Sequence, residues 1–378
     1  MRVFDALVSF IGRTIVAVLS LSAVIALATF LVVGFQKDAA CKEVVDNPAP
    51  PVASTAVPHL SELAVMPNYM RGEQVSPLTF PEWYIVYNAR EYAHFLGQHK
   101  APTDFPFGLA TAQYWCSYTY LTKYSEKHYP PDTRGLIVLM TIGASFSAEN
   151  MIESAYEQSF GRLSGWNGTD TPEDTIQREE AEKYAAFLDT VPWYEYPFFS
   201  AVWRVWKTPL VGPHILRKWE RKLALTIGYG MKGVYGLVIG KATHAAYAPA
   251  DLSIMLLVQG PLTSNALSDP DIKIAKDFGD GTLVLEVPRY QKFSRIMQEI
   301  AHENISILDI AGGKTIVISA SAPNIWYYDL PGILFFTQPL TVDQEHKRIV
   351  AAVPVQQLPE VIRKMAAEDV VLEHVYDY

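Results

Sequence analysis

Residues 14–35 read TIVAVLSLSAVIALATFLVVGF, a stretch that is uncharged and almost wholly apolar. About 20 apolar residues in a helix span the ~30 Å hydrocarbon core of a bilayer. A cleaved signal peptide has a shorter apolar core, of ~7–15 residues, before a small-residue cleavage site. Ala26-Leu27-Ala28 resembles such a site, but the apolar run continues to Phe35. The stretch therefore predicts an uncleaved transmembrane helix, and the lipid bilayer is the first expected partner.

The residues on either side of this stretch predict its orientation and a spacer after it. Arg2 and Arg13 precede the helix, while Lys37 and Lys42 come after it, and the positive-inside rule then favours a cytoplasmic N-terminus. Residues 47–58, NPAPPVASTAVP, predict a stiff extended spacer. We therefore expect an anchor over residues 1–36, a Pro/Ala-rich tether over 37–62, and a single-pass protein whose remainder is extracytoplasmic.

Composition excludes some classes of function. The net charge of −9 argues against a nucleic-acid binder, because such a protein needs a basic face to neutralise phosphates. The two cysteines, Cys41 and Cys116, are too few for a cysteine-rich metal site. They form one disulfide if this part of the chain faces an oxidising compartment, and otherwise remain two thiols. The sequence leaves both alternatives open, and it predicts no cofactor.

Residues 63–250 predict a mainly helical domain that is rich in aromatic residues. Residues 80–96, FPEWYIVYNAREYAHFL, predict a helix from about Pro81 with Tyr84, Tyr87, Glu91 and His94 along one side.

Two further features of this region define expected helices. The uncharged run from Gly135 to Ala148 is short for a span and predicts a buried helix. Thr171 followed by Pro172 is typical of a helix start, with the threonine as the cap.

The segment 216–240 is ambiguous. LRKWERK is followed at 223–240 by LALTIGYGMKGVYGLVIG, which is long enough for a second span except that Lys232 lies in its middle. A lysine at mid-membrane costs ~2.5–3.5 kcal/mol on insertion scales. We expect a buried or interfacial helix, with a second span as the alternative. The basic and aromatic cluster at its start is a candidate for contact with anionic headgroups, and comprises Arg217, Lys218, Trp219, Arg221 and Lys222.

Residues 251–378 contain an apparent internal repeat. Residues 254–263 resemble 333–341, and residues 283–291 resemble 349–357; a helical pattern and a strand follow each pair. The order strand–strand–helix–strand thus occurs twice, over about 254–310 and 333–376, with 315–322 as an added strand. The predicted fold class is α+β, with a duplicated ββαβ domain related to the ferredoxin-like layout.

Carboxylates and a histidine in the helical region are candidates for chemistry. Glu91 and His94 form a Glu-x-x-His pattern, and Glu149 begins a series of glutamates at helical spacing. A di-iron bundle needs two Glu-x-x-His motifs, and only one is present, so no metal site is predicted. The candidates for a catalytic site are Glu82, Glu91, His94 and Glu149.

Two functions are compatible with these features. The first is a non-enzymatic, membrane-anchored protein that binds a small ligand between the C-terminal repeats or assembles with other subunits of a membrane complex. The alternative is a membrane-bound enzyme with the carboxylate and histidine site in the helical domain. No motif specific to a known family decides between them.

Overall fold

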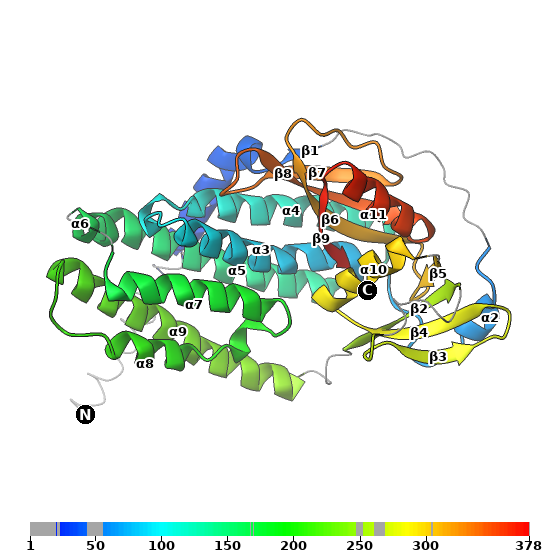
Figure 1. The fold of residues 1–378 in the computed structure, drawn as a ribbon. Helices are drawn as coiled ribbons and strands as arrows, with labels where there is room; N and C mark the ends of the chain where they lie inside the picture. Colours follow the sequence, from blue (N-terminus) through cyan, green and yellow to red (C-terminus); the bar gives the residue numbers. More distant parts are fainter. Residues whose placement is uncertain are drawn as a thin grey trace, which may run out of the picture.

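The computed structural model describes Ser20 and residues 23–43, 56–166, 168, 170–246, 252–260, 269–303 and 305–377. Figure 1 shows a bundle of long helices at one end of the molecule and two β-sheets at the other. Helices and antiparallel strands are both extensive, which confirms a mixed helix-and-sheet fold.

The N-terminal helix is described from Ala23 to Ala40, and this stretch is long and apolar enough to cross a membrane. Val32 and Gln36 lie against Gly108 at the start of α4 (Phe107–His128). Strand β1 (Lys42–Glu43) comes almost directly after the helix and pairs antiparallel with β7 (Ile333–Pro339). The first residues of the predicted tether are therefore helix and strand, while residues 44–55 lie outside the described residues.

Helices form all the described regular structure between residues 75 and 246. They are α3 (Val75–Gly97), α4, α5 (Thr133–Tyr156), α6 (Arg162–Gly165), α7 (Pro172–Leu188), α8 (Phe198–Trp206) and α9 (Ile215–Ala246). A π-helical turn (Glu157–Gly161) continues α5 into α6, and 3₁₀ turns lie at Pro102–Asp104 and Trp193–Glu195. A short helix, α2 (Leu60–Leu63), precedes the bundle.

Helix α3 begins earlier than the sequence predicts. It starts at Val75 rather than near Pro81, and Pro81 lies inside it. Phe80, Tyr84 and Tyr87 are buried in an aromatic core shared with α4 and the neighbouring sheet. Tertiary packing of this kind supplies most of the stability of a helix and here outweighs the proline.

Two other helix predictions have opposite outcomes. Thr171 caps α7 as expected, and with Asp174 it completes a capping box. The prediction of a buried helix over 135–148 is wrong. These residues belong to the longer helix α5, and one side of α5 is exposed. Leu139 and Phe146 are buried, whereas Ile137 is 61% exposed.

Eight strands of the C-terminal region form two four-stranded antiparallel groups. The first sheet has the order β3-β4-β2-β5, with bounds β2 (Ser253–Gln259), β3 (Lys273–Asp277), β4 (Thr282–Pro288) and β5 (Ser306–Ile310). The second has the order β7-β8-β6-β9, and β1 joins it beside β7; its bounds are β6 (Thr315–Pro323), β7, β8 (His346–Pro354) and β9 (Val371–Tyr376). Helix α10 (Gln291–His302) joins β4 to β5, and α11 (Leu358–Ala367) joins β8 to β9.

The two sheets have the same connectivity, and one of the two strand equivalences that the sequence suggested agrees with it. Residues 283–291 and 349–357 overlap β4 and β8, which occupy equivalent positions, whereas residues 254–263 and 333–341 overlap β2 and β7, which do not. The shared order equates β2 with β6, β3 with β7, β4 with β8 and β5 with β9. The stretch 315–322, predicted as an added strand, is therefore the first strand of the second unit. The first unit also contains β3, in a stretch where the sequence predicts no strand. In both units the helix connects two parallel strands that flank the first strand.

The sheets and helices pack in layers. Along β6, Ile316 and Ile318 join the core around α10 and α11, whereas Val317 faces the aromatic core of α3 and α4. One continuous apolar core fills the space between the two sheets and includes Phe293 of α10 and Met365 of α11. The second sheet therefore lies between the helical bundle on one side and α10 and α11 on the other.

Candidate functional site

The four residues considered for a catalytic site do not come together. Glu91 is buried on α3, whereas Glu82 and His94 on the same helix are exposed. Glu149 lies on α5, and its carboxylate is 2.5 Å from Nζ of Lys232 on α9. Among the described residues, no group of three His, Cys, Asp or Glu side chains is placed to hold a metal ion.

Glu91 instead belongs to a buried ion cluster that joins the bundle to the second sheet. Its Oε1 accepts a hydrogen bond from Nη2 of Arg348 at 2.9 Å, and its Oε2 accepts one from the backbone N–H of Thr341 at 2.9 Å. Arg348 also donates to both carboxylate oxygens of Glu373, at 2.7 and 3.0 Å. The guanidinium carbon lies 4.0 Å from the ring centre of Tyr87, a cation–π contact.

The charge balance of this cluster depends on one arginine. Burial raises the pKa of Glu91, against the opposing effect of the Arg348 charge. Burial lowers the pKa of Arg348, but the charges of Glu373 and Glu91 outweigh it and hold that pKa well above its ordinary value. Arg348 therefore stays charged, and it is the cation that neutralises two carboxylates from different elements.

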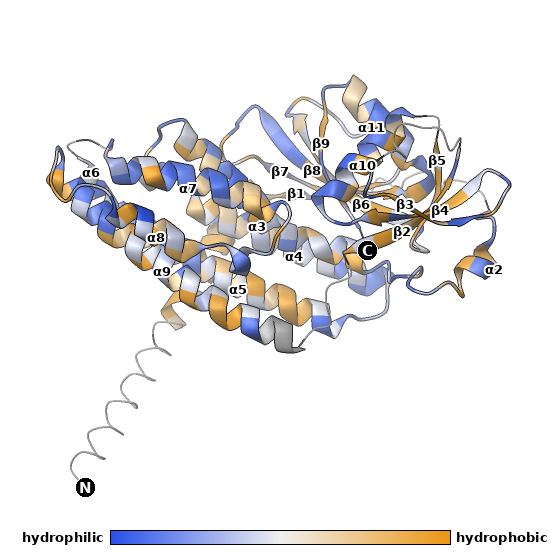
Figure 2. Cartoon of the chain, turned by 60° about the horizontal axis from the view of Figure 1, so that its bottom comes forward, coloured by the Kyte–Doolittle hydropathy of each residue, from blue (hydrophilic) through white to orange (hydrophobic). Residues whose placement is uncertain are grey.

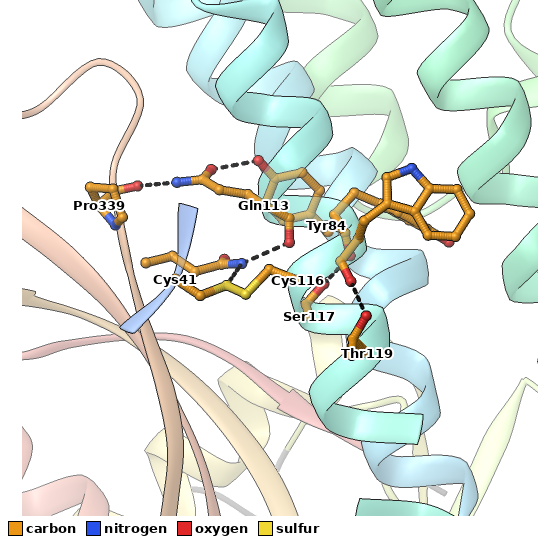
Figure 3. Close-up of a disulfide and its surroundings, with 10 residues drawn as sticks. Cys41, Tyr84, Gln113, Cys116, Ser117, Thr119 and Pro339 are labelled. Carbon is orange, nitrogen blue, oxygen red and sulfur yellow. Dashed lines mark hydrogen bonds between the residues drawn. A yellow bond between two sulfur atoms is a disulfide. The ribbon is translucent and has the colours of Figure 1, made fainter. Parts of the chain in front are cut away.

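The end of the N-terminal helix is fixed to the same junction between the bundle and the second sheet. Cys41 forms a disulfide with Cys116 of α4, which decides the alternatives that the sequence leaves open. Figure 3 shows the bond beside the polar side chain of Gln113, whose Nε2 donates to the carbonyl of Pro339 at 2.7 Å. Tyr84 donates to Oε1 of Gln113 at 2.6 Å. The end of the N-terminal helix, the bundle and the second sheet thus meet within one network.

The basic cluster predicted to face lipid headgroups is inside the protein. Arg217, Lys218, Arg221 and Lys222 are each 0–1% exposed, while Trp219 is partly exposed. Arg217 pairs with Asp174 at 2.7 Å, and the other three cations likewise meet acidic partners; these partners comprise Glu157, Glu173 and Glu220. The four charged side chains are therefore not available to headgroups, and they bind α9 to α7 and to the π-helical turn that comes after α5.

No signal in the sequence distinguishes a basic cluster that is buried in the protein from one that faces lipid headgroups. Residues 217, 218, 221 and 222 share one side of a helix, a spacing that suits a solvated face and a buried face equally. Glu220 is a neighbour in sequence, but the other acidic partners, Glu157, Glu173 and Asp174, lie 43 to 64 positions away along the chain. Arg348 and Glu91 are separated by 257 positions, so the sequence gives no sign of their pairing.

A cavity lies next to the junction, between the bundle and the loop that comes after β7. Its volume is about 450 Å³, within the ~300–1,000 Å³ of small-molecule sites. Thr341 lines it together with Phe95, Lys100, Asp104, Pro106, Leu109, Pro339, Leu340, Val342 and Gln344. The hydroxyl oxygen of Thr341 is buried without a hydrogen-bond partner in the described structure. The cavity is therefore mostly apolar, and its polar lining residues are Lys100, Asp104, Thr341 and Gln344.

His374 on β9 is a buried histidine between Trp83 of α3 and helix α10. Its ring stacks on Trp83 with 3.9 Å between centroids, and its Nδ1 lies 3.1 Å from both Ser294 Oγ and Gln291 Oε1 of α10. Burial lowers its pKa well below the ordinary value, and the nearby charge of Arg90 acts in the same direction. The folded protein therefore holds this ring neutral.

Acidification is expected to cost stability through His374. Because its pKa is lower in the folded than in the unfolded protein, unfolding takes up a proton below the unfolded pKa of ~6.5, and stability falls as the pH falls. His374→Phe keeps a stacking ring and removes the titration. Between pH 7.5 and 5.5, the free energy of unfolding should fall more for the unsubstituted protein than for the variant, by at most about 1.4 kcal/mol per pH unit below 6.5. Denaturant titrations in detergent measure both, and parallel pH profiles would contradict the assignment.

The chain was compared with models of protein families, with curated proteins and with solved structures, and none of the three comparisons found a match.

Proposed function

We propose that the protein is a membrane-anchored, non-enzymatic binding or complex-assembly protein whose folded part stands on the extracytoplasmic side. The observation that carries this proposal is the disulfide between Cys41 and Cys116. Disulfides persist in oxidising compartments and are rare in the cytosol. Cys41 comes directly after the apolar helix, so the side of the membrane on which that helix ends is the oxidising side.

The pairing of β1 with β7 supports one arrangement of the chain. Lys42 lies opposite Thr337 and Glu43 opposite Phe336, so the second sheet stands on the same side as the end of the anchor. The chain between residues 43 and 333 must then cross the membrane an even number of times. A single extra span at 223–240 is incompatible with this pairing, because it would move the sheets to the opposite side.

The firm attachment of the anchor favours a role in binding or assembly. A disulfide, a strand pairing and the contact of Val32 and Gln36 with α4 hold the body in a fixed position at the membrane. A flexible tether would let the body search a large volume, whereas a fixed body presents one surface at one height to neighbouring subunits. We infer further that the two sheets with equal connectivity are a duplicated, ferredoxin-like-related unit.

The contacts of the candidate residues favour binding over the enzymatic alternative. Glu91 is held by Arg348, and Glu149 by Lys232, in separate ion pairs. The cavity beside Thr341 provides a place for a small ligand or a partner side chain, at the junction and not between the two sheets. Its apolar wall with few polar groups suits a mostly apolar ligand that carries one polar or charged group.

Thiol labelling in intact cells tests both the proposed side of the membrane and the proposed disulfide. A membrane-impermeant maleimide should leave Cys41 and Cys116 unlabelled in untreated cells and should label both after an impermeant reductant and a denaturant are added. The double variant C41S/C116S, which has no other cysteine, is the blank. Labelling that requires permeabilised cells but no reductant would contradict the proposal, because it would show free thiols in the cytoplasm.

A further inference from the structure

Large apolar side chains are exposed on three adjacent helices. Ile137 of α5 is 61% exposed, Trp203 of α8 is 65% exposed, and Ile227 and Met231 of α9 are 61% and 63% exposed. Figure 2 shows hydrophobic residues along α5, α8 and α9. We call the outward side of these three helices the apolar face. Apolar areas of this extent on a folded protein mark an interaction surface.

Contacts between the three helices make this face continuous. Ser145 of α5 lies 3.2 Å, oxygen to oxygen, from the hydroxyl of Tyr235 on α9. Trp206 of α8 donates from its indole nitrogen to Thr226 of α9 at 2.9 Å. The ring of Phe199 on α8 lies against Gly233 of α9. The exposed residues therefore belong to one surface.

On α9 the charged residues are turned away from this surface. From Leu216 to Val238 every exposed residue is uncharged. The four cations at residues 217, 218, 221 and 222 are buried, and Lys232 points to Glu149 between α9 and α5. This stretch measures roughly 33 Å at 1.5 Å per residue. A helix whose outer side faced water would not need to keep its charged residues on the inner side over six turns.

Helix α8 has the features of a helix that lies in a membrane surface. Ala201 and Val205 are buried against the bundle, whereas Phe199, Trp203 and Trp206 are exposed. Tryptophan is enriched at the interface between membrane and water, and helices that lie in this plane carry tryptophan and phenylalanine on their apolar side. Lys207 ends the helix with its ammonium 5.8 Å from the ring centre of Trp203.

We infer that α5, α8 and α9 lie parallel to the membrane surface, with the apolar face inserted among the headgroups and outer acyl chains of the leaflet that the anchor enters. This inference rests on the proposed membrane anchoring and deepens it. The uncharged exposed side of α9 and the exposed tryptophans of α8 make lipid the occupant that the arrangement favours over a second copy of the chain. The protein would then contact lipid with four helices rather than one.

The charged residues of α7 decide how α5 and α9 are oriented relative to the membrane. Among the residues that the structure describes, three helices could cross a bilayer by length and composition alone, and they span Ala23–Ala40, Thr133–Gly165 and Ile215–Lys241. Helix α7 packs against α3 and α9, and it exposes Glu179, Glu182 and Lys183. If α5 and α9 crossed as a pair, these charges would enter the hydrocarbon, where exposed charges are strongly disfavoured. The parallel orientation leaves them in water.

Spin labels on the full-length protein in phosphatidylcholine–phosphatidylglycerol vesicles test this inference. Single cysteines at Met140 and Ile227 probe the apolar face, with the disulfide left intact. Phe30→Cys reports on the anchor, Glu182→Cys on α7, and Ile274→Cys on an exposed apolar residue of β3. The labels at residues 140 and 227 should resemble that at residue 30, with a ratio of oxygen to nickel-chelate accessibility several-fold above the ratios at residues 182 and 274.

Each other result has a distinct meaning. Access of nickel chelate to residues 140 and 227 but not to residue 30 would overturn the inference and leave the anchor in place. Low access of both reagents to residues 140 and 227 would also overturn it, because protein would then cover the face. Access of nickel chelate to residue 30 would contradict the proposed anchoring itself. Labels at Leu216, Ile227 and Val238 should report equal depth, and a maximum at Ile227 would overturn the parallel orientation.

Discussion

Replacing Arg348 by methionine is expected to lower the free energy of unfolding by about 3–5 kcal/mol. The substitution removes the cation that Glu91 and Glu373 share. It leaves buried Glu91 without its cation and removes the bidentate partner of Glu373. Denaturant unfolding of purified protein in detergent measures the loss.

Two variants separate this effect from a loss of packing. The triple variant R348M/E91Q/E373Q removes the uncompensated charges, so most of the lost stability should return. Arg162→Met is a matched surface control, because Arg162 and Asp104 are both more than half exposed and 3.7 Å apart. Its expected cost is at most about 1 kcal/mol. An equal loss in R348M and R162M would show that the cluster contributes nothing particular to the fold.

The double variant C41S/C116S is expected to lose about 4 kcal/mol of stability. The disulfide closes a loop of 75 residues. The chain-entropy relation gives about 4.5 kcal/mol for a loop of this length at 25 °C, and measured values are typically somewhat lower. The loss should appear as an earlier unfolding midpoint of the body that Cys116 belongs to, because the unfolded chain gains freedom when the bond is absent.

Reduction of the unsubstituted protein provides an independent check. A reductant should shift its unfolding midpoint to that of C41S/C116S and should leave the double variant unchanged. Serine replaces sulfur with a smaller polar atom, so a second pair, C41A/C116A, controls for burial of the hydroxyls at this site. Equal stability of oxidised protein and both double variants would contradict a structural role for the bond.

Several features of the fold can be predicted from local patterns in the sequence. The apolar run ending at Phe35 predicts the N-terminal helix, and the pair Thr171-Pro172 predicts the start of α7. These predictions succeed because their causes are local: hydrophobicity along one segment, and one side chain that satisfies the first free amides of a helix.

The strand equivalence in the C-terminal region could not be predicted in the same way. Strand β3 reads KIAKD, and four of its five residues are exposed, so its composition resembles a loop. Its counterpart β7 reads ILFFTQP and pairs on both edges, with β8 and β1. The sequences of β2 and β7 are similarly apolar, which suggests that these two strands are equivalent. The order of strands in space instead makes β2 equivalent to β6.

The candidate site was the least predictable part. The pattern Glu91-x-x-His94 places two titratable groups one turn apart, but the sheet packs on the side of α3 that carries Glu91, and His94 remains in water. Which side of a helix becomes buried depends on partners that are distant in sequence, here Arg348 and Thr341. The burial of the basic residues between 217 and 222 likewise depends on acidic partners that are distant in sequence, so the sequence alone places these residues at the membrane surface.

The most direct test is to determine on which side of the membrane the two sheets lie. Alkaline phosphatase, whose activity requires disulfide formation, should be active when it is fused after the last residue, Tyr378, and inactive when it is fused before Met1. A fluorescent protein that matures only in the cytoplasm should give the opposite pattern at the two ends. The account predicts phosphatase activity at the C-terminus; cytoplasmic fluorescence there would contradict it, because β1 and β7 would then lie on opposite sides of the membrane.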